Sequence, residues 1–139
     1  LDKIITFDLK NSLRLEGDTC SYIQYSYARA SRILEKMDAK PNFDTGFEIL
    51  SSEYEKNLIK KIAIFDVQIN DSVNNLSPKV IAKYSYDLAV TFSSFYEHVK
   101  VLKSETSELL NARLCLVVSF QKTLKSSLGL LGIDAPERM

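Results

Sequence analysis

Apolar residues recur at helical spacing between Thr19 and Lys36, and this pattern constrains the fold more than any other feature of the chain. Asp18 or Thr19 has the side chain of a helix N-cap, and the pattern ends before Lys40-Pro41. At roughly 100° per residue, one apolar arc of this helix contains Ile23, Tyr27, Ala30, Ile33, Leu34 and Met37. Such an arc is stable only when other elements cover it, so the fold must bury this face.

A second strip of the same helix carries tyrosines and basic residues beside the apolar arc. It is about 80° wide by helical geometry and contains Tyr22, Tyr25, Arg29, Arg32 and Lys36. Aromatic rings stack on unpaired bases and guanidinium groups bind phosphate, so this mixture suits single-stranded nucleic acid. By itself the strip is also typical of an ordinary helix edge, on which Tyr22 and Tyr25 cover the core margin and the arginines lie in water.

Two more stretches show helical spacing further along the chain. Residues 48–75 have apolar residues every three or four positions, with an expected break near Asp66. Ser77-Pro78 is a start signal, because the hydroxyl can cap a helix and proline suits its first position. The helix that follows places its apolar stripe at Ile81, Tyr84, Leu88, Phe92, Phe95, Val99 and Leu102, with Tyr96 beside it.

A long final helix completes the predicted set. It is expected from about Thr106 to Leu131, because Gly132 can adopt the left-handed conformation that ends a helix. Strand character is confined to Ile4–Phe7, and the loops are of moderate length. The predicted fold is therefore an all-α antiparallel helical bundle.

The beginning of the chain differs from the rest. Asp8 is expected to cap a short helix that Gly17 ends, and the chain starts at Leu1 rather than at a methionine. We therefore expect a piece of a longer protein, with residues 1–17 as a connector with a short helix and residues 18–139 as a single helical domain.

Composition limits the kind of partner. A chain of 139 residues with 45% hydrophobic and 26% charged residues is expected to be one folded domain. Its formal net charge is zero, so attraction of nucleic acid by the whole molecule is excluded and any such site must be a local patch. No apolar run could span a membrane, and Cys20 and Cys115 suggest reduced core or near-core residues, so we expect a cytoplasmic monomer.

The residues that usually carry catalysis are scarce. His98 is the only histidine, the chain has four glycines, and no glycine-rich phosphate loop is present. We predict no catalytic residue and no metal site, because one histidine without a carboxylate or thiol cluster rarely binds a metal. Lys56, Lys60 and Lys61 are interpreted as a solvated helix face rather than as a phosphate site.

Five segments together resemble the C-terminal domain of arginyl-tRNA synthetases, and the resemblance covers nearly the whole chain. They are Leu13–Thr19, Tyr22–Arg29, Tyr86–Ala89 with Phe95-Tyr96, Ala112–Leu114 and Leu130–Met139. The terminal Pro-Glu-Arg-Met, with Tyr-x-Gln-Tyr-x-x-x-Arg upstream, is the specific part of the resemblance.

The resemblance implies an all-helical DALR-type anticodon-binding domain that follows a class I catalytic domain. That catalytic domain would ligate arginine to its tRNA with ATP and magnesium, whereas this fragment would hold no cofactor and be inactive alone. The implied partners are the anticodon loop of tRNA(Arg) and the catalytic domain of the same protein. The resemblance further implies that Tyr22, Tyr25 and Arg29 face the anticodon loop, with Tyr96 and Met139 on the same side.

Two departures from the family pattern concern the main helix. Cys20-Ser21-Tyr22 stands where the family usually has Gly-Pro-Tyr, which removes two residues with special backbone properties. Tyr27 stands where the family often has histidine, and its angular position predicts that it faces the core. Two alternatives remain open, a helical protein-interaction module and the equivalent domain of a cysteinyl- or methionyl-tRNA synthetase.

The last seven residues are predicted to dock rather than to extend the final helix. They follow a glycine stop and include Pro136, which cannot continue a helix without loss of a hydrogen bond. We expect Ile133 to fold back onto the bundle and Pro136 to direct Met139 toward Tyr22, Tyr25 and Tyr96.

Overall fold

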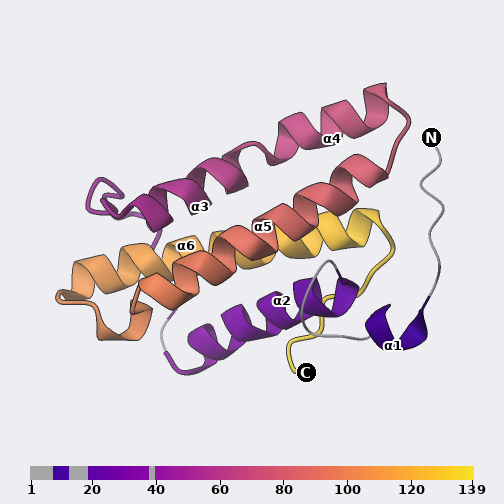
Figure 1. Ribbon diagram of the computed structural model, residues 1–139. Coiled ribbons are helices and arrows are strands. Elements are labelled where there is room, and N and C mark those ends of the chain that lie inside the picture. The colour runs from indigo at the N-terminus through magenta and orange to yellow at the C-terminus, as the bar shows by residue number, and fades with distance from the viewer. Residues whose placement is uncertain (1–7, 13–18, 38–39) are drawn as a thin grey trace.

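A computed structural model describes residues 8–12, 19–37 and 40–139, and within these ranges the chain is all-α, as predicted. Figure 1 shows a bundle of long helices, with the short helix α1 beside the start of α2. The elements are α1 (Leu9–Ser12), α2 (Cys20–Glu35), α3 (Glu53–Ala63), α4 (Phe65–Asn74), α5 (Lys79–His98), the 3-10 helix η1 (Val101–Lys103) and α6 (Ser107–Leu130). The expected strand at Ile4–Phe7 and the connector after α1 lie outside the described residues.

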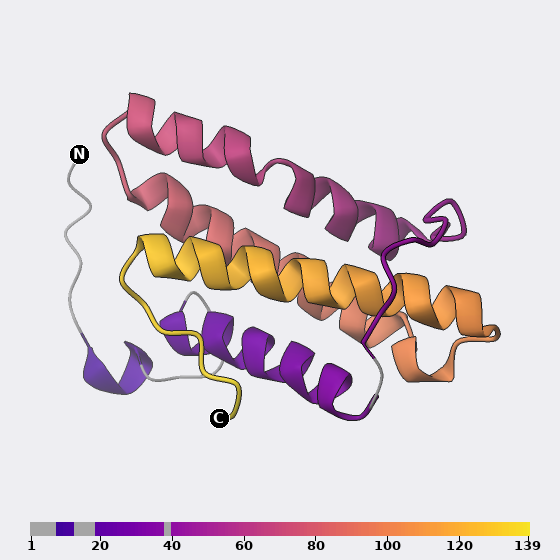
Figure 2. The same cartoon turned by 180° about the vertical axis from the view of Figure 1, so that it is seen from behind.

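The antiparallel arrangement is confirmed. If α3 and α4 are taken as one interrupted rod, each long helix reverses the direction of the one before it (Figures 1 and 2). Helices α5 and α6 pack against each other, α2 contacts both of them, and α3 contacts both as well. As a consequence α2 and α5 run side by side in the same direction, so their last turns lie at the same end of the bundle.

Side-chain caps begin four of the described helices, three of them where the sequence indicated. At the start of α1 the Asp8 carboxylate accepts the Lys10 N–H at 2.9 Å. The Thr19 hydroxyl accepts the Tyr22 N–H at 3.2 Å, and the Thr106 hydroxyl accepts the Leu109 N–H at 3.1 Å. Helix α3 starts with a capping box, in which the Glu55 carboxylate accepts the Ser52 N–H at 2.9 Å. These bonds satisfy N–H groups that the first turn of a helix leaves without partners.

Helix α6 ends as predicted at Gly132. This residue has φ of +70°, a conformation that costs glycine little because it has no Cβ. The Ile133 N–H donates to Leu128 O at 3.0 Å and the Gly132 N–H to Gly129 O at 3.0 Å, the two bonds of a Schellman motif. The motif turns the chain back, and Ile133 packs against the core as expected.

Four boundaries differ from the sequence prediction. Helix α5 ends at His98, because Val99 is extended with φ of −109° and ψ of 112°, so Leu102, predicted on the buried stripe, is an exposed residue of η1. Residues 48–52 are not helical, although Leu50 is buried there, because the capping box starts α3 at Glu53. The break between α3 and α4 falls at Ile64 rather than at Asp66, and Pro78 rather than Ser77 is the cap residue of α5. These differences arise because propensity defines the ends of helices less sharply than their existence.

One prediction about the cysteines was wrong. Cys115 is buried as predicted, but Cys20, the first residue of α2, is exposed. Both thiols are free. Among the described residues, none of the helices is long and apolar enough to cross a membrane.

The core lies where α2, α3, α5 and α6 meet. The Phe92 and Phe120 rings stack with centroids 3.8 Å apart and planes 5° apart, and neither side chain is exposed. Tyr27 is 3% exposed, so its predicted orientation toward the core is confirmed. Tyr96, one turn beyond Phe92 on α5, is 42% exposed and so lies at the edge of the core.

The contrast between Phe92 and Tyr96 generates a stability prediction. Phe92→Ala should lower the free energy of unfolding by about 3–5 kcal/mol, because it leaves a cavity in a close-packed core. Tyr96→Ala should cost clearly less, because water already covers much of that ring. Urea denaturation of both variants measures the difference, and equal losses would show that Tyr96 belongs to the core.

Candidate nucleic-acid interface

A cavity of about 500 Å³ opens between the last turns of α2, the end of α5, η1 and the C-terminal tail. The helices reach this place because α2 and α5 run in the same direction and end together (Figure 1). Its lining comprises Tyr25, Ala28, Arg29, Arg32, Ile33, Lys36, Tyr96, Val99, Lys100, Val101, Leu102, Lys103 and Met139. Five of the six predicted site residues therefore meet at one cavity, and Tyr22 does not.

Arg29 stands at the junction of the two helices. Its guanidinium carbon lies 4.7 Å from the centroid of the Tyr25 ring and 4.6 Å from that of the Tyr96 ring. Both distances are within the range of cation–π attraction, so one arginine links an α2 ring to an α5 ring. The Tyr96 ring is in turn 6.4 Å from that of Phe92, which connects this cluster to the core.

The cavity is positively charged although the chain is neutral overall. Its basic residues come from α2 and from the segment around η1, and they are Arg29, Arg32, Lys36, Lys100 and Lys103. Among the described residues that line it, none is acidic. The hydrogen bond and positive charge of Arg29 lower the pKa of Tyr25, with a smaller effect from Arg32. The site therefore favours an anionic ligand that also offers flat apolar surfaces.

The C-terminal tail lies along α2, as the yellow segment in Figures 1 and 2 shows. Gln24 donates its amide N–H to Asp134 O at 2.8 Å, and Arg32 donates to Met139 O at 3.4 Å. A salt bridge of 3.6 Å joins Arg138 to Glu35, with both side chains largely in water. These contacts place Met139 at the cavity, with half of its surface exposed.

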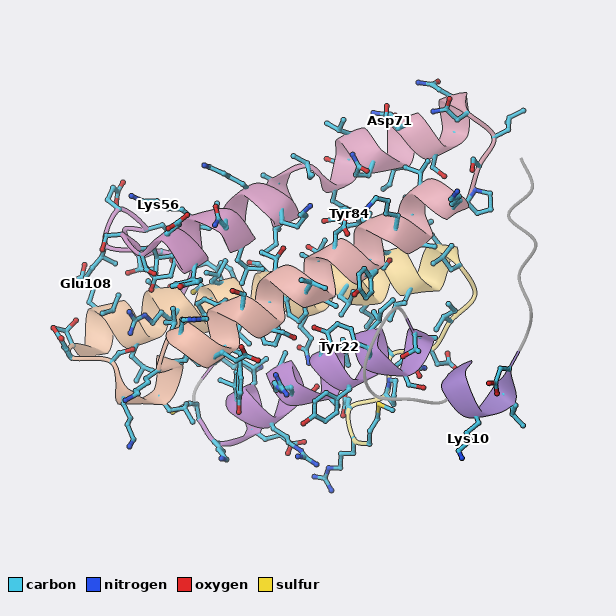
Figure 3. The ribbon with its side chains drawn as sticks, viewed as in Figure 1. Lys10, Tyr22, Lys56, Asp71, Tyr84 and Glu108 are labelled. Carbon is cyan, nitrogen blue, oxygen red and sulfur yellow. The ribbon has the colours of Figure 1, made fainter. Side chains whose placement is uncertain are left out.

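Tyr22 lies apart from the cavity, nearer to the start of α2. Its hydroxyl donates to Ser93 Oγ at 3.0 Å, and its ring lies 5.8 Å from that of Tyr86. Figure 3 shows the labelled Tyr22 between α2 and α5. Of all the strip residues, Tyr22 is nearest to the apolar arc, and it belongs to the first turn of α2. For these reasons it packs on α5 and does not line the cavity.

Sequence reasoning missed the wall formed by η1. Lys100 and Lys103 line the cavity because the chain turns after α5, whereas the sequence pattern predicts a helix that continues through Leu102. His98, by contrast, points away from the cavity wall: its ring stacks on Tyr54 at 4.1 Å and its Nδ1 lies 2.8 Å from Ser94 O. In the described part of the chain, no group of three potential metal ligands is present.

Comparison with known proteins identifies similar domains. The family profile described as DALR anticodon binding domain matches residues 23–139. The arginine–tRNA ligase of Methanothrix thermoacetophila is 44% identical over 138 residues, which are 99% of this chain and 24% of that protein. The ligase of Clostridium acetobutylicum is 39% identical over 139 residues, again 99% and 24%. The chain thus spans about a quarter of the length of these curated relatives.

Solved structures agree with the sequence relatives. The arginyl-tRNA synthetase of Thermus thermophilus matches with a TM-score of 0.86 and 34% identity, over 96% of this chain and 23% of that one. The arginyl-tRNA synthetase of Plasmodium falciparum matches with a TM-score of 0.79 and 31% identity, over the same two shares. Both likenesses extend over the helices that form the cavity.

The electrostatics of the cavity can be tested by titration. The Tyr25 phenol should lose its proton at lower pH than an ordinary tyrosine, because Arg29 stabilises the phenolate. Arg29→Met should raise the pKa of Tyr25, whereas Tyr27, whose pKa burial already raises, should change little. NMR titration of tyrosine Cζ signals measures both values. An unchanged Tyr25 pKa in Arg29→Met would contradict the contact between these two side chains.

Proposed function

This chain belongs to the DALR anticodon-binding domain family, and on that premise we propose that it binds the anticodon loop of tRNA(Arg) as part of an arginine–tRNA ligase. The family match favours RNA binding over a protein-interaction module, and the relatives favour the arginine enzyme over the cysteinyl and methionyl ones. The observation that carries the proposal is the Tyr25–Arg29–Tyr96 cluster in a basic cavity.

Each proposed site residue has a role that its surroundings support. Tyr25 and Tyr96 present rings on which unpaired loop bases stack, and the exposed side of Met139 adds an apolar contact. Arg29 and Arg32 neutralise phosphates, and Lys36, Lys100 and Lys103 add to that charge. Tyr22 contributes indirectly, because its bond to Ser93 holds α2 and α5 together beside the cavity.

Arg29 gives the proposed binding event a specific first step. Its guanidinium is stacked on Tyr25 and Tyr96 in the free protein, where it occupies ring surface that a base would use. When RNA enters, Arg29 exchanges these cation–π contacts for a charged hydrogen bond to phosphate, and the rings exchange arginine for a base. Binding therefore requires Arg29 to move off the two rings, which already lie on either helix beside the cavity in the free protein.

The reaction itself is assigned to the remainder of the protein. Curated relatives named as arginine–tRNA ligases are about four times as long as this chain, and we propose that the ATP- and magnesium-dependent ligation takes place outside it. Residues 1–17 would connect the two parts. In a monomeric cytoplasmic enzyme the anticodon contact would act together with the acceptor end, so it raises affinity through effective concentration.

Stacking and charge can be separated by two substitutions in the bundle. Tyr25→Ala should weaken binding of a tRNA(Arg) anticodon stem-loop by about 1–3 kcal/mol, as loss of base–aromatic stacking does. Arg32→Gln should weaken it and also make log Kd less dependent on salt, because one phosphate contact is lost. Fluorescence titration at two salt concentrations measures both effects.

Matched controls lie on other faces. Tyr54→Ala removes a ring that stacks on His98, and Lys125→Gln removes an exposed cation from α6. Both controls should bind the stem-loop as the parent does. Equal affinities for all four folded variants would show that this strip is an ordinary solvated helix edge.

The tail provides a second test of the proposed interface. Deletion of Met139 should leave the melting temperature nearly unchanged, because a half-exposed terminal side chain contributes little to the core. It should nevertheless weaken stem-loop binding, since Met139 lines the cavity. Thermal unfolding and titration of the same sample measure the two effects, and an affinity equal to the parent's would remove Met139 from the site.

A further inference from the structure

The η1 wall of the cavity has few hydrogen bonds of its own. It is a single 3-10 turn, in which the Val101 N–H donates to Val99 O at 2.9 Å and the Lys103 N–H to Lys100 O at 3.1 Å. Turns of this length have poor hydrogen-bond geometry and little intrinsic stability. Val101 is buried, but Leu102 and Lys103 are exposed, so packing secures only one of the three residues.

A chain of four hydrogen bonds ties this turn to two helices. The Ser104 hydroxyl donates to Val101 O at 2.7 Å and accepts from Arg113 Nη1 at 3.0 Å. Arg113 also donates through Nε to Glu55 Oε1 at 2.7 Å. The other carboxylate oxygen of Glu55 accepts the Ser52 N–H at 2.9 Å, which is part of the cap of α3. The network therefore joins η1 to the start of α3 and to α6.

The network is partly buried, with Glu55 at its centre, and lies behind the cavity rather than in it. Glu55 is 1% exposed, and the side chain of Arg113 is 16% exposed. None of Ser52, Glu55, Ser104 and Arg113 is among the described residues that line the cavity. Burial of an ion pair is costly and contributes little net stability compared with apolar packing, so its main effect is to define geometry.

The two ends of the Arg113 guanidinium make this geometry possible. A planar fork can donate to Glu55 and to Ser104 at once, whereas the single ammonium of lysine is less suited to bridging two fixed acceptors. Ser104, held by Arg113, in turn donates a hydrogen bond to Val101 O, the carbonyl inside η1, and so restrains the turn. Lys100, Val101, Leu102 and Lys103 all line the cavity, so the position of this turn affects its shape and charge.

We infer that Ser104 and Arg113 are positioning residues of the RNA-binding cavity: they hold η1 so that Lys100 and Lys103 remain at its wall. The inference rests on the proposed function, because it specifies how that site is kept ready for an anionic ligand. Neither residue touches the ligand. They act through the turn, so loss of the Ser104 link should loosen η1 and weaken binding with little change in overall stability.

The test compares three hydroxyl variants of the full chain. Ser104→Ala removes the link to Val101 O, Ser104→Thr keeps it, and Thr106→Ala removes the nearby cap of α6 as a control. Amide hydrogen exchange at Lys103 measures how often the η1 turn opens, and titration with the anticodon stem-loop measures binding affinity. We expect Ser104→Ala to speed exchange at Lys103 and to weaken binding roughly three- to tenfold, as loss of one hydrogen bond does. Ser104→Thr and Thr106→Ala should behave as the parent does at this turn.

A fourth variant tests Arg113 itself. Arg113→Lys keeps a cation beside Glu55 but cannot hold Glu55 and Ser104 together in the same way, so exchange at Lys103 should rise as in Ser104→Ala. In the Ser104→Ala background the same substitution should add little at Lys103, because both changes break one chain of contacts. If the exchange rate at Lys103 is unchanged in Arg113→Lys, Arg113 pairs with Glu55 but does not position η1.

The remaining outcomes also decide the question. If Ser104→Ala has the parent's exchange rate at Lys103 and the parent's affinity, Ser104 has no positioning role. The same conclusion follows if Thr106→Ala loses as much affinity as Ser104→Ala, or if Ser104→Thr is as impaired as Ser104→Ala. If the parent does not bind the stem-loop, the proposed function fails, and exchange at Lys103 alone then decides whether Ser104 and Arg113 position η1. If Tyr25→Ala weakens binding and Ser104→Ala does not, the proposed function stands and the positioning role is rejected.

Discussion

The burial of one face of α2 against α5 and α6 is the constraint on which the site depends. Tyr27, Ala30 and Ile33 are each at most 5% exposed, and together they fix the rotation of α2 about its axis. With that rotation fixed, Arg29 and Arg32 must lie at the border between core and solvent, because neighbouring positions are set about 100° apart. A less firmly packed helix would not hold its basic strip at a defined edge of the bundle.

A neutral chain can still present a strongly basic surface when the fold gathers its cations. The cavity collects five basic residues from α2 and from the segment around η1, while acidic side chains such as Glu35 and Glu55 are paired elsewhere. Screening at moderate salt limits electrostatic attraction to about 10 Å. The local arrangement of charge, rather than the total, therefore determines what this surface attracts.

The two walls that complete the cavity are held in different ways. The tail is attached by hydrogen bonds to Gln24 and Arg32 and by a salt bridge in water, contacts of the kind that contribute little stability. The turn at η1 is connected to the partly buried Glu55–Arg113 pair through Ser104. One wall thus depends on surface contacts that can adapt to a ligand, and the other on a partly buried network with defined geometry.

Periodicity and end signals in the sequence determined the helices, the bundle and most of the core. Thr19, Thr106 and Gly132 act locally, through bonds to residues a few positions away, so their roles could be predicted from the residues alone. The same reasoning put Tyr22 with Tyr25 and Arg29, because a helical wheel ignores position along the axis and the neighbouring helix. Only the tertiary structure decided that Tyr22 packs on Ser93 and Tyr86, that Tyr96 meets Arg29, and that Lys100 and Lys103 complete the cavity. Those contacts join segments more than 60 residues apart in sequence, such as Tyr22 and Ser93, which are separated by 71 positions. They depend on how α2 and α5 align along their lengths, which the packing of whole helices determines and no local pattern encodes.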